Sequence, residues 1–208
     1  MKEKSRIVSL NSSYRRKGNT NRMVEEVLKG CREAGTKTDH IFLMEKDIKA
    51  CLGCLKFSKY NEETFGRCVQ KDDMRGLLKK VVFADGLIVA CLVYCGNMNA
   101  HMVKFMHRMS PLAYDKSLDG GMVGIPVYKL KPTKPGMYIT SMIAPFPLNR
   151  VMGVYRNFYK MLRLVLRLAG FKADYVLNVG GSEEKTSIPN REEMKSKAFK
   201  LCMKLAGH

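Results

Sequence analysis

IVSLNSSYRRKGNT, residues Ile7–Thr20, is the stretch that decides how the rest of the chain can be arranged. A short apolar strand, Arg6 to Leu10, leads into a loop of small polar residues and cations, and a helix begins near Asn19. The first turn of a helix has backbone N–H groups without intrahelical partners and carries a partial positive charge. A strand, a polar loop and a helix N-terminus in this order predict a cradle for a phosphate group.

The side chains of this loop suit two different roles. Those that could contact a phosphate carry a hydroxyl, an amide or a positive charge: Ser12, Ser13, Arg15, Arg16, Lys17, Asn19 and Thr20. Gly18 permits a backbone turn that a Cβ atom would obstruct. The loop matches neither G-x-x-x-x-G-K-[ST] nor G-x-G-x-x-G, which argues against a P-loop NTPase and a dinucleotide fingerprint. Asn19 or Thr20 could instead be a simple helix N-cap behind a solvated loop, and the loop alone leaves both interpretations open.

Length and composition are those of an ordinary globular protein. The 208 residues are 46% hydrophobic and 27% charged, so we expect one domain over residues 1–208. The charged start, MKEKSR, leads straight into a strand, and no uncharged apolar run reaches membrane-spanning length. The seven cysteines are scattered and odd in number, which is typical of reduced thiols in the cytoplasm.

The formal net charge of +18 is large, and it raises the question of an anionic partner. Lys and Arg are spread along the chain without a recognisable nucleic-acid-binding motif. We therefore favour a generally basic surface over a dedicated nucleic-acid module, and keep a basic nucleic-acid- or surface-binding protein as an alternative.

Apolar runs and helical periodicities alternate along the chain. The predicted strands are Arg6–Leu10, Thr38–Leu43, Gly86–Ala90, Gly136–Ser141 and Ala173–Val179. The predicted helices are Thr20–Gly35, Asp72–Phe83, Asn99–Met109, Leu148–Gly170 and Asn190–Ala206. Alternation of this kind predicts an α/β fold with a parallel sheet covered on both faces. Ligands of such sheets bind at the carboxyl ends of the strands, which here are followed by the loops 9–20, 91–97 and 140–149.

Several motifs in order resemble the flavodoxin-like NADPH-dependent FMN reductases, especially the branch related to iron–sulfur flavoproteins. They are the loop Ser12–Thr20, the cysteines Cys51, Cys54 and Cys68 before Asp72-Asp73-Met74, the segments Ala84–Ile88 and Leu92–Asn97, and the helix Met102–Arg108. The resemblance covers most of residues 7–110. It implies a doubly wound five-stranded parallel sheet of order 2-1-3-4-5 with helices on both faces.

The resemblance also implies a site for FMN. The phosphate would be held by Ser13, Arg15, Asn19 and Thr20. The isoalloxazine would be flanked by Leu92, Val93, Tyr94, Gly96, Asn97 and Met98, with Thr140 and Ser141 closing the other edge. Such a flat ring needs backbone donors at its edge and apolar or aromatic contacts on its face.

The cysteine segment departs from the pattern of the iron–sulfur branch. That branch has C-x2-C-x2-C followed by a fourth cysteine, whereas the third position here is Phe57. Cys51, Cys54 and Cys68 are the candidate metal ligands, but three thiolates are one short of the usual [4Fe–4S] set. Cys91 or Cys95 would have to supply the fourth, so the sequence favours a flavoprotein without a cluster.

The function that the resemblance implies is an FMN-dependent oxidoreductase that passes electrons from NAD(P)H through FMN to a quinone, a flavin or another acceptor. The cofactor would carry the chemistry, so no catalytic side chain is predicted. An FMN electron carrier that does not oxidise NAD(P)H is the main alternative. The helix near 151–169 has a broad apolar surface, which fits either a subunit contact or one wide stripe that faces the chain's own core. The resemblance to a family that forms dimers or tetramers favours a homo-oligomer.

Overall fold

The computed structural model describes residues 5–54, 56–57, 67–113, 131–141, 154–179 and 191–206. Their core is a sheet in the order β2 (Lys37–Phe42), β1 (Arg6–Asn11), β3 (Gly86–Tyr94), β5 (Gly136–Ser141) and β6 (Tyr175–Val179). All neighbours on this path are parallel. The predicted fold class and strand order are confirmed, since the fourth and fifth predicted strands are β5 and β6.

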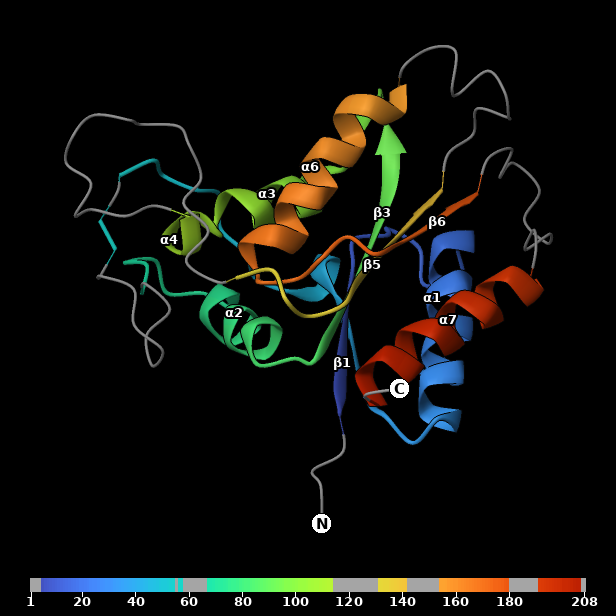
Figure 1. The fold of residues 1–208 in the computed structure, drawn as a ribbon. Coiled ribbons are helices and arrows are strands. Elements are labelled where there is room, and N and C mark those ends of the chain that lie inside the picture. Colours follow the sequence, from blue (N-terminus) through green and yellow to red (C-terminus); the bar gives the residue numbers. More distant parts are fainter. Residues whose placement is uncertain are drawn as a thin grey trace.

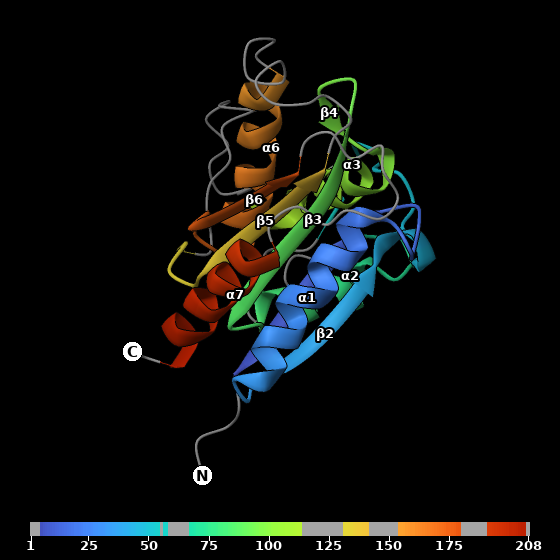
Figure 2. The ribbon, with the colours of Figure 1, turned by 90° about the vertical axis from the view of Figure 1, so that its right-hand side faces the viewer.

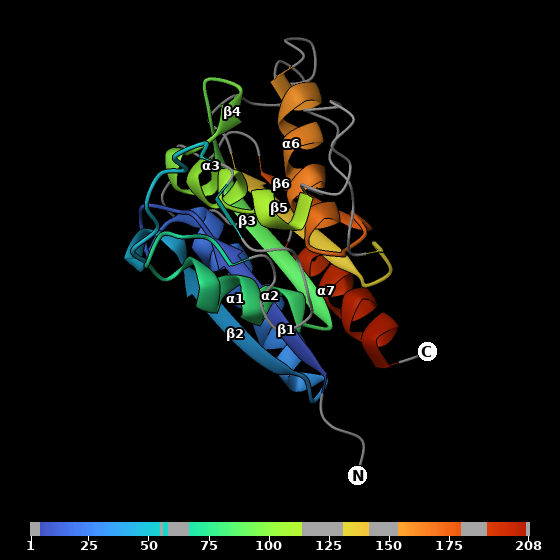
Figure 3. The same cartoon turned by 90° about the vertical axis from the view of Figure 1, so that its left-hand side faces the viewer.

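Helices cover both faces of the sheet (Figure 1). On one face, α1 (Asn19–Glu33) and α7 (Arg191–Ala206) lie side by side, as Figure 2 shows. Figure 3 shows the opposite face, which carries α2 (Met74–Val82), α3 (Ala100–His107) and α6 (Val154–Leu168). The short helices η1 (Leu43–Glu45) and α4 (Ser110–Ala113) follow β2 and α3.

The sheet separates two apolar cores because successive side chains of a strand point to opposite faces. Ile7, Ile88 and Met137 pack with α1 and α7, while Val8 and Val89 join the core under α2, α3 and α6. The first six residues of β3 are buried, which agrees with the prediction of a strand covered on both sides. The two layers of helices therefore leave the strand ends as the place where polar loops gather.

The segment after the third strand differs from the prediction. β3 does not end at Ala90 but continues to Tyr94, and β4 (Asn97–Met98) pairs antiparallel with it. The φ angles of Cys95 and Gly96 are 47° and 74°. Two consecutive residues with positive φ are typical of a tight hairpin turn. The predicted loop of residues 92–98 is therefore a β-hairpin.

Helix α6 does not expose the apolar face on which the oligomer was argued. Phe158, Leu162, Val165 and Leu166 are buried in the chain's own core, and Arg156, Lys160, Arg163 and Arg167 form the exposed stripe. The described part of the helix thus has one wide face that packs inward. No helix in the described ranges is both long and apolar enough to span a membrane. Residues 148–153 of the predicted helix and most of the predicted 115–135 loop lie outside the described residues.

Candidate functional site

The loop after β1 is attached to the middle of β3 and to the start of α3. The N–H and the Oγ of Ser12 both donate to the Ala90 carbonyl, at 3.0 and 3.2 Å. The Nδ2 of Asn99, at the start of α3, donates to the Ser12 carbonyl. The first predicted site loop is therefore held by buried hydrogen bonds to the residues on either side of the second, Ala90 and Asn99.

The N-terminus of α1 has no side-chain cap. Its N-cap is Gly18, so the alternative that Asn19 or Thr20 caps the helix is wrong. The φ of Gly18 is −76°, which any residue can adopt, so backbone freedom does not explain this glycine. A Cβ atom at this position would lie 3.2 Å from the Arg15 carbonyl oxygen, so close packing explains the glycine. With no acidic residue in its first turn, the helix presents partial positive charge toward the loop.

The four predicted phosphate contacts differ in their surroundings. Ser13 is buried, and its Oγ accepts from the Arg15 N–H at 3.3 Å and donates to the Arg15 carbonyl at 3.2 Å. The Arg15 side chain is exposed and Asn19 is half-buried. Thr20 is buried and shares a 2.6 Å hydrogen bond with the Ser141 hydroxyl. The hydroxyls of Ser13 and Thr20 therefore shape the loop and tie it to β5.

Thr140 and Ser141 lie on opposite faces of the sheet, as adjacent residues of a strand must. Ser141 reaches α1 through Thr20, whereas the Oγ1 of Thr140 donates to Asn178 Oδ1 of β6 at 2.7 Å. Only Ser141 of this predicted pair is joined to the phosphate loop.

The β3–β4 hairpin brings an aromatic cluster to the same edge. The Tyr94 ring, 51% exposed, is 6.0 Å from that of Tyr14, which is 5.4 Å from the ring of His101. Burial, followed by the nearby Lys104 charge, lowers the pKa of His101, so this ring is neutral at pH 7. The other predicted hairpin residues range from buried to exposed: Met98 is buried, Leu92, Val93 and Gly96 are half-buried, and Asn97 is exposed. Tyr14 and His101 were not predicted, although Tyr14 is the one aromatic residue of the loop.

Buried amides that sequence reasoning missed hold the edge together. The Oδ1 of Asn99 accepts from the Met102 N–H at 3.2 Å and caps α3, and the Cys91 thiol lies 3.9 Å from the same oxygen. The Oδ1 of Asn11 accepts from the Ser13 N–H at 2.9 Å. The position of Asn99 at a predicted helix start was the available signal, whereas nothing local marks Asn11.

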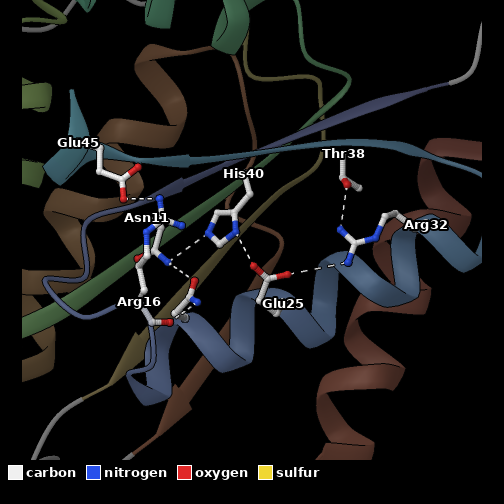
Figure 4. A network of polar contacts seen from close by, with 8 residues as sticks. Asn11, Arg16, Glu25, Arg32, Thr38, His40 and Glu45 are labelled. Carbon is white, nitrogen blue, oxygen red and sulfur yellow. Dashed lines mark hydrogen bonds and ion pairs between the residues drawn. The ribbon is translucent and has the colours of Figure 1, made fainter. Parts of the chain in front are cut away.

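Asn11 belongs to a network that runs below the loop (Figure 4). Its Nδ2 lies 2.9 Å from Asn21 Oδ1 and 3.2 Å from His40 Nε2. The Nδ1 of His40 lies 2.9 Å from a carboxylate oxygen of Glu25. A histidine of β2 is thereby connected to the phosphate loop through one amide.

The three candidate cysteine ligands lie elsewhere, at the other end of α3. They line a cavity of about 70 Å³ together with Phe57, His107 and Arg108, and Phe57 forms a β-bridge with Cys68. In the described part of the chain, no group of three or more Cys, His, Asp or Glu is placed to hold a metal ion.

Arg108 anchors this end of α3. It contacts the carboxylate of Asp72 through both terminal nitrogens and donates to the Lys49 carbonyl at 2.9 Å. The side chains of both partners are 2% exposed or less. Burial, the largest influence, raises the pKa of Asp72, but the hydrogen bonds from Arg108, Lys49 and Met74 outweigh it, so the pKa is lowered overall.

Comparison with known proteins identifies the family. The family model of the NADPH-dependent FMN reductases matches residues 5–134. The chain belongs to this family.

Curated relatives of this chain include iron–sulfur flavoproteins from two organisms. One from Methanocaldococcus jannaschii is 36% identical over 107 residues, covering 51% of this chain and 53% of that protein. One from Archaeoglobus fulgidus is 34% identical over 116 residues, covering 55% and 50%. The chain thus spans about half the length of these relatives.

Solved structures share the fold at low sequence identity. An NAD(P)H:quinone oxidoreductase from Methanothermobacter marburgensis has a TM-score of 0.65 at 16% identity, covering 99% of this chain and 98% of that one. An FMN-dependent NADH-azoreductase from Bacillus anthracis has a TM-score of 0.60 at 12% identity, with 98% of both chains covered. At these sequence identities, the two comparisons show a shared fold and nothing more.

The family and its iron–sulfur relatives suggest two cofactors, FMN and an iron–sulfur cluster. The residues present suit FMN better than the cluster. An uncapped helix N-terminus beside a basic loop and aromatic rings suits a phosphorylated flat cofactor such as FMN. A four-thiolate cluster does not fit the cysteine cavity, because Phe57 takes the third ligand position. Cys91 does not line the cavity; burial raises its pKa to about 11 and its thiol donates to the Leu92 carbonyl.

Proposed function

We propose that this protein is an FMN-dependent oxidoreductase in which FMN bound at the strand ends carries electrons from NAD(P)H to a quinone, a flavin or another small acceptor. The observation that carries the proposal is the uncapped N-terminus of α1, behind Gly18, at the edge where the β3–β4 hairpin presents Tyr94. Membership of the FMN reductase family supports it.

In this proposal the chain orients the cofactor. The N-terminus of α1 and the Arg15 guanidinium bind the phosphate, while the Ser13 and Thr20 hydroxyls hold the loop in shape around it. Asn19 stands in the first turn of the same helix. The hairpin residues 92–98 border the ring, and Tyr94 supplies an aromatic wall. Bound FMN would supply the reversible two-electron chemistry that side chains lack.

The remaining attributes are those expected from the sequence: NAD(P)H as reductant, a cytoplasmic location and a homo-oligomer. The apolar face of α6 no longer supports the oligomer, because its described residues are buried within the chain. An FMN carrier that does not oxidise NAD(P)H is a second candidate, favoured by relatives named iron–sulfur flavoproteins.

Titration with FMN and riboflavin tests the phosphate site. We expect FMN to bind more tightly than riboflavin, and Arg15→Ala to weaken FMN about tenfold, since a charge-assisted hydrogen bond contributes roughly 1.5–3 kcal/mol. Lys29→Ala is the matched control, because it removes one exposed positive charge from the far half of α1. Equal losses in both variants, or equal affinities for FMN and riboflavin, would contradict the site.

Anaerobic mixing of the FMN complex with NADPH or NADH separates enzyme from carrier. Loss of the visible flavin absorbance supports the oxidoreductase, and an unchanged spectrum supports the carrier. A protein that binds no FMN but shifts DNA with a steep salt dependence would leave only the basic binding protein.

A further inference from the structure

The network beneath the phosphate loop contains two amides whose orientations are fixed by backbone groups. The Ser13 N–H is a donor only, so the atom of Asn11 that it contacts must be Oδ1. The Arg16 carbonyl is an acceptor only, so the atom of Asn21 that contacts it must be Nδ2. The Nδ2 of Asn11 therefore faces both Asn21 Oδ1 and the His40 ring.

This arrangement leaves one protonation state for His40. Its Nε2 faces an NH2 group at 3.2 Å and must accept a hydrogen bond, while its Nδ1 faces the Glu25 carboxylate at 2.9 Å and must donate one. Only the neutral ring with its proton on Nδ1 satisfies both contacts. A proton on Nε2 would set two donors against each other.

We propose that His40 is a positioning residue of the phosphate loop: the neutral ring, through Asn11, holds the Ser13 turn in the shape that binds the FMN phosphate, and protonation of Nε2 releases that turn. This inference rests on the proposed binding of FMN at the loop.

The consequence of protonation follows from the atoms involved. The clash can be relieved by turning the Asn11 amide over, which places an oxygen against His40. The same rotation removes the acceptor of the Ser13 N–H and the donor to Asn21 Oδ1. The turn at Ser13 also includes the Arg15 backbone, so a change at His40 reaches a predicted phosphate contact through two residues.

Charged groups from two elements face the ring. Glu25 and Arg32 come from α1, and Arg16 from the loop, where it pairs with Glu45 and lies over the Phe42 ring. The Phe42 ring also stacks near His40, with centroids 4.5 Å apart. Burial, the largest influence, lowers the pKa of His40, and the two arginines add to this, against Glu25, which raises it. The neutral ring is thus the form that prevails at pH 7.

The test combines FMN titration with NMR of the histidine ring. FMN dissociation constants are measured from pH 8 to pH 5.5 for the wild type and for His40→Gln, whose amide can accept from Asn11 and donate to Glu25 without titrating. Because the FMN phosphate also titrates near pH 6, the quantity of interest is the ratio of the two constants. We expect this ratio, wild type over variant, to rise as the pH falls below the His40 pKa and to approach tenfold only well below it. The titration is therefore extended to at least one unit below the His40 pKa that NMR gives.

Long-range ¹H–¹⁵N spectra of the FMN-free wild type give an independent reading, with His40 assigned by its absence in the variant. We expect the Nδ1–H tautomer at pH 8, and a tenfold coupling requires FMN to lower the His40 pKa by about one unit. A ratio that stays flat with pH, or an Nε2–H tautomer, overturns the inference while leaving the FMN site intact. Absence of FMN binding at every pH overturns the proposed function itself.

Discussion

The two ends of α3 are both anchored by a buried polar side chain, but the anchors differ in charge. At the N-terminal end, the neutral amide of Asn99 joins the phosphate loop to α3 and caps the helix. At the C-terminal end, the buried ion pair of Arg108 and Asp72 joins the helix to the cysteine segment. An amide can be replaced at moderate cost, whereas half of a buried ion pair cannot be removed without leaving a charge uncompensated.

The ends also differ in how complete their sites are. The N-terminal end of α3 meets the uncapped N-terminus of α1, a basic loop that hydrogen bonds hold in place, and aromatic rings. The C-terminal end has three thiols around a small cavity. Phe57 stands where the iron–sulfur pattern has its third cysteine, so one of the four ligands is missing. One helix thus separates a site that suits its cofactor from one that lacks a ligand.

Arg108→Met is expected to have the largest effect. It leaves the Asp72 carboxylate buried without its partner, so the free energy of unfolding should fall by about 3–5 kcal/mol. Urea unfolding at pH 7 measures this. The double variant Asp72→Asn with Arg108→Met removes both charges and should recover at least half of the loss. Equal stabilities of the single and double variants would show that the pair is not the anchor.

Asn99→Ala should cost less, about 1–2 kcal/mol, because it removes a helix cap and a bond to the Ser12 carbonyl. FMN affinity should fall as well, since the loop loses its tie to α3. Asn99→Ser separates the two effects: its hydroxyl oxygen can still cap the helix, but it lacks the amide that donates to the Ser12 carbonyl. It should therefore retain most of the stability and still bind FMN weakly, as seen by unfolding and titration together.

Acidification should destabilise the two regions in separate pH ranges. The folded-state pKa of His40 is lowered, so its contribution is fully present above the ordinary histidine value of about 6.5 and is lost below it. The pKa of Asp72 is also lowered, so its contribution is present above about 3.9 and is lost at still lower pH. Melting temperatures from pH 8 to 3 test this. His40→Gln is expected to reduce only the upper step, to which His101, whose pKa is also lowered, contributes as well.

Phe57→Cys should change stability least, by less than about 1 kcal/mol, because Phe57 is only half-buried. It restores a fourth thiol opposite Cys68 in the β-bridge. After anaerobic incubation with iron and sulfide, the variant should take up about four irons per chain and the wild type none. Iron and sulfide analysis measures whether a cluster has formed. Phe83→Cys is the control, because it adds a thiol at an exposed position away from the cavity.

Much of the fold could be predicted because its signals are local. The apolar run from Gly86 and the alternation of strands with helices are readable in the chain itself, and they predicted the α/β class. The sheet order was predicted from the family resemblance. The hairpin after β3 was missed because its turn at Cys95–Gly96 depends on φ angles that no apolar pattern reports. Grouping Thr140 with Ser141 overlooked that adjacent residues of a strand point to opposite faces. The sequence alone does not show which of the two faces α1, and in the structure it is Ser141.

The sequence by itself determined the α/β class, the basic loop before α1 and the missing third cysteine, because composition, periodicity and motif spacing are properties of neighbouring residues. Only the tertiary structure decided that Gly18 and not Asn19 occupies the N-cap position of α1. It also decided that Asn99 ties the loop to α3 and that His40 reaches Ser13 through Asn11. These contacts join β1, β2, β3 and α3, whose side chains meet only when the sheet has formed. Hydrogen bonds between distant residues leave no periodic trace in a sequence.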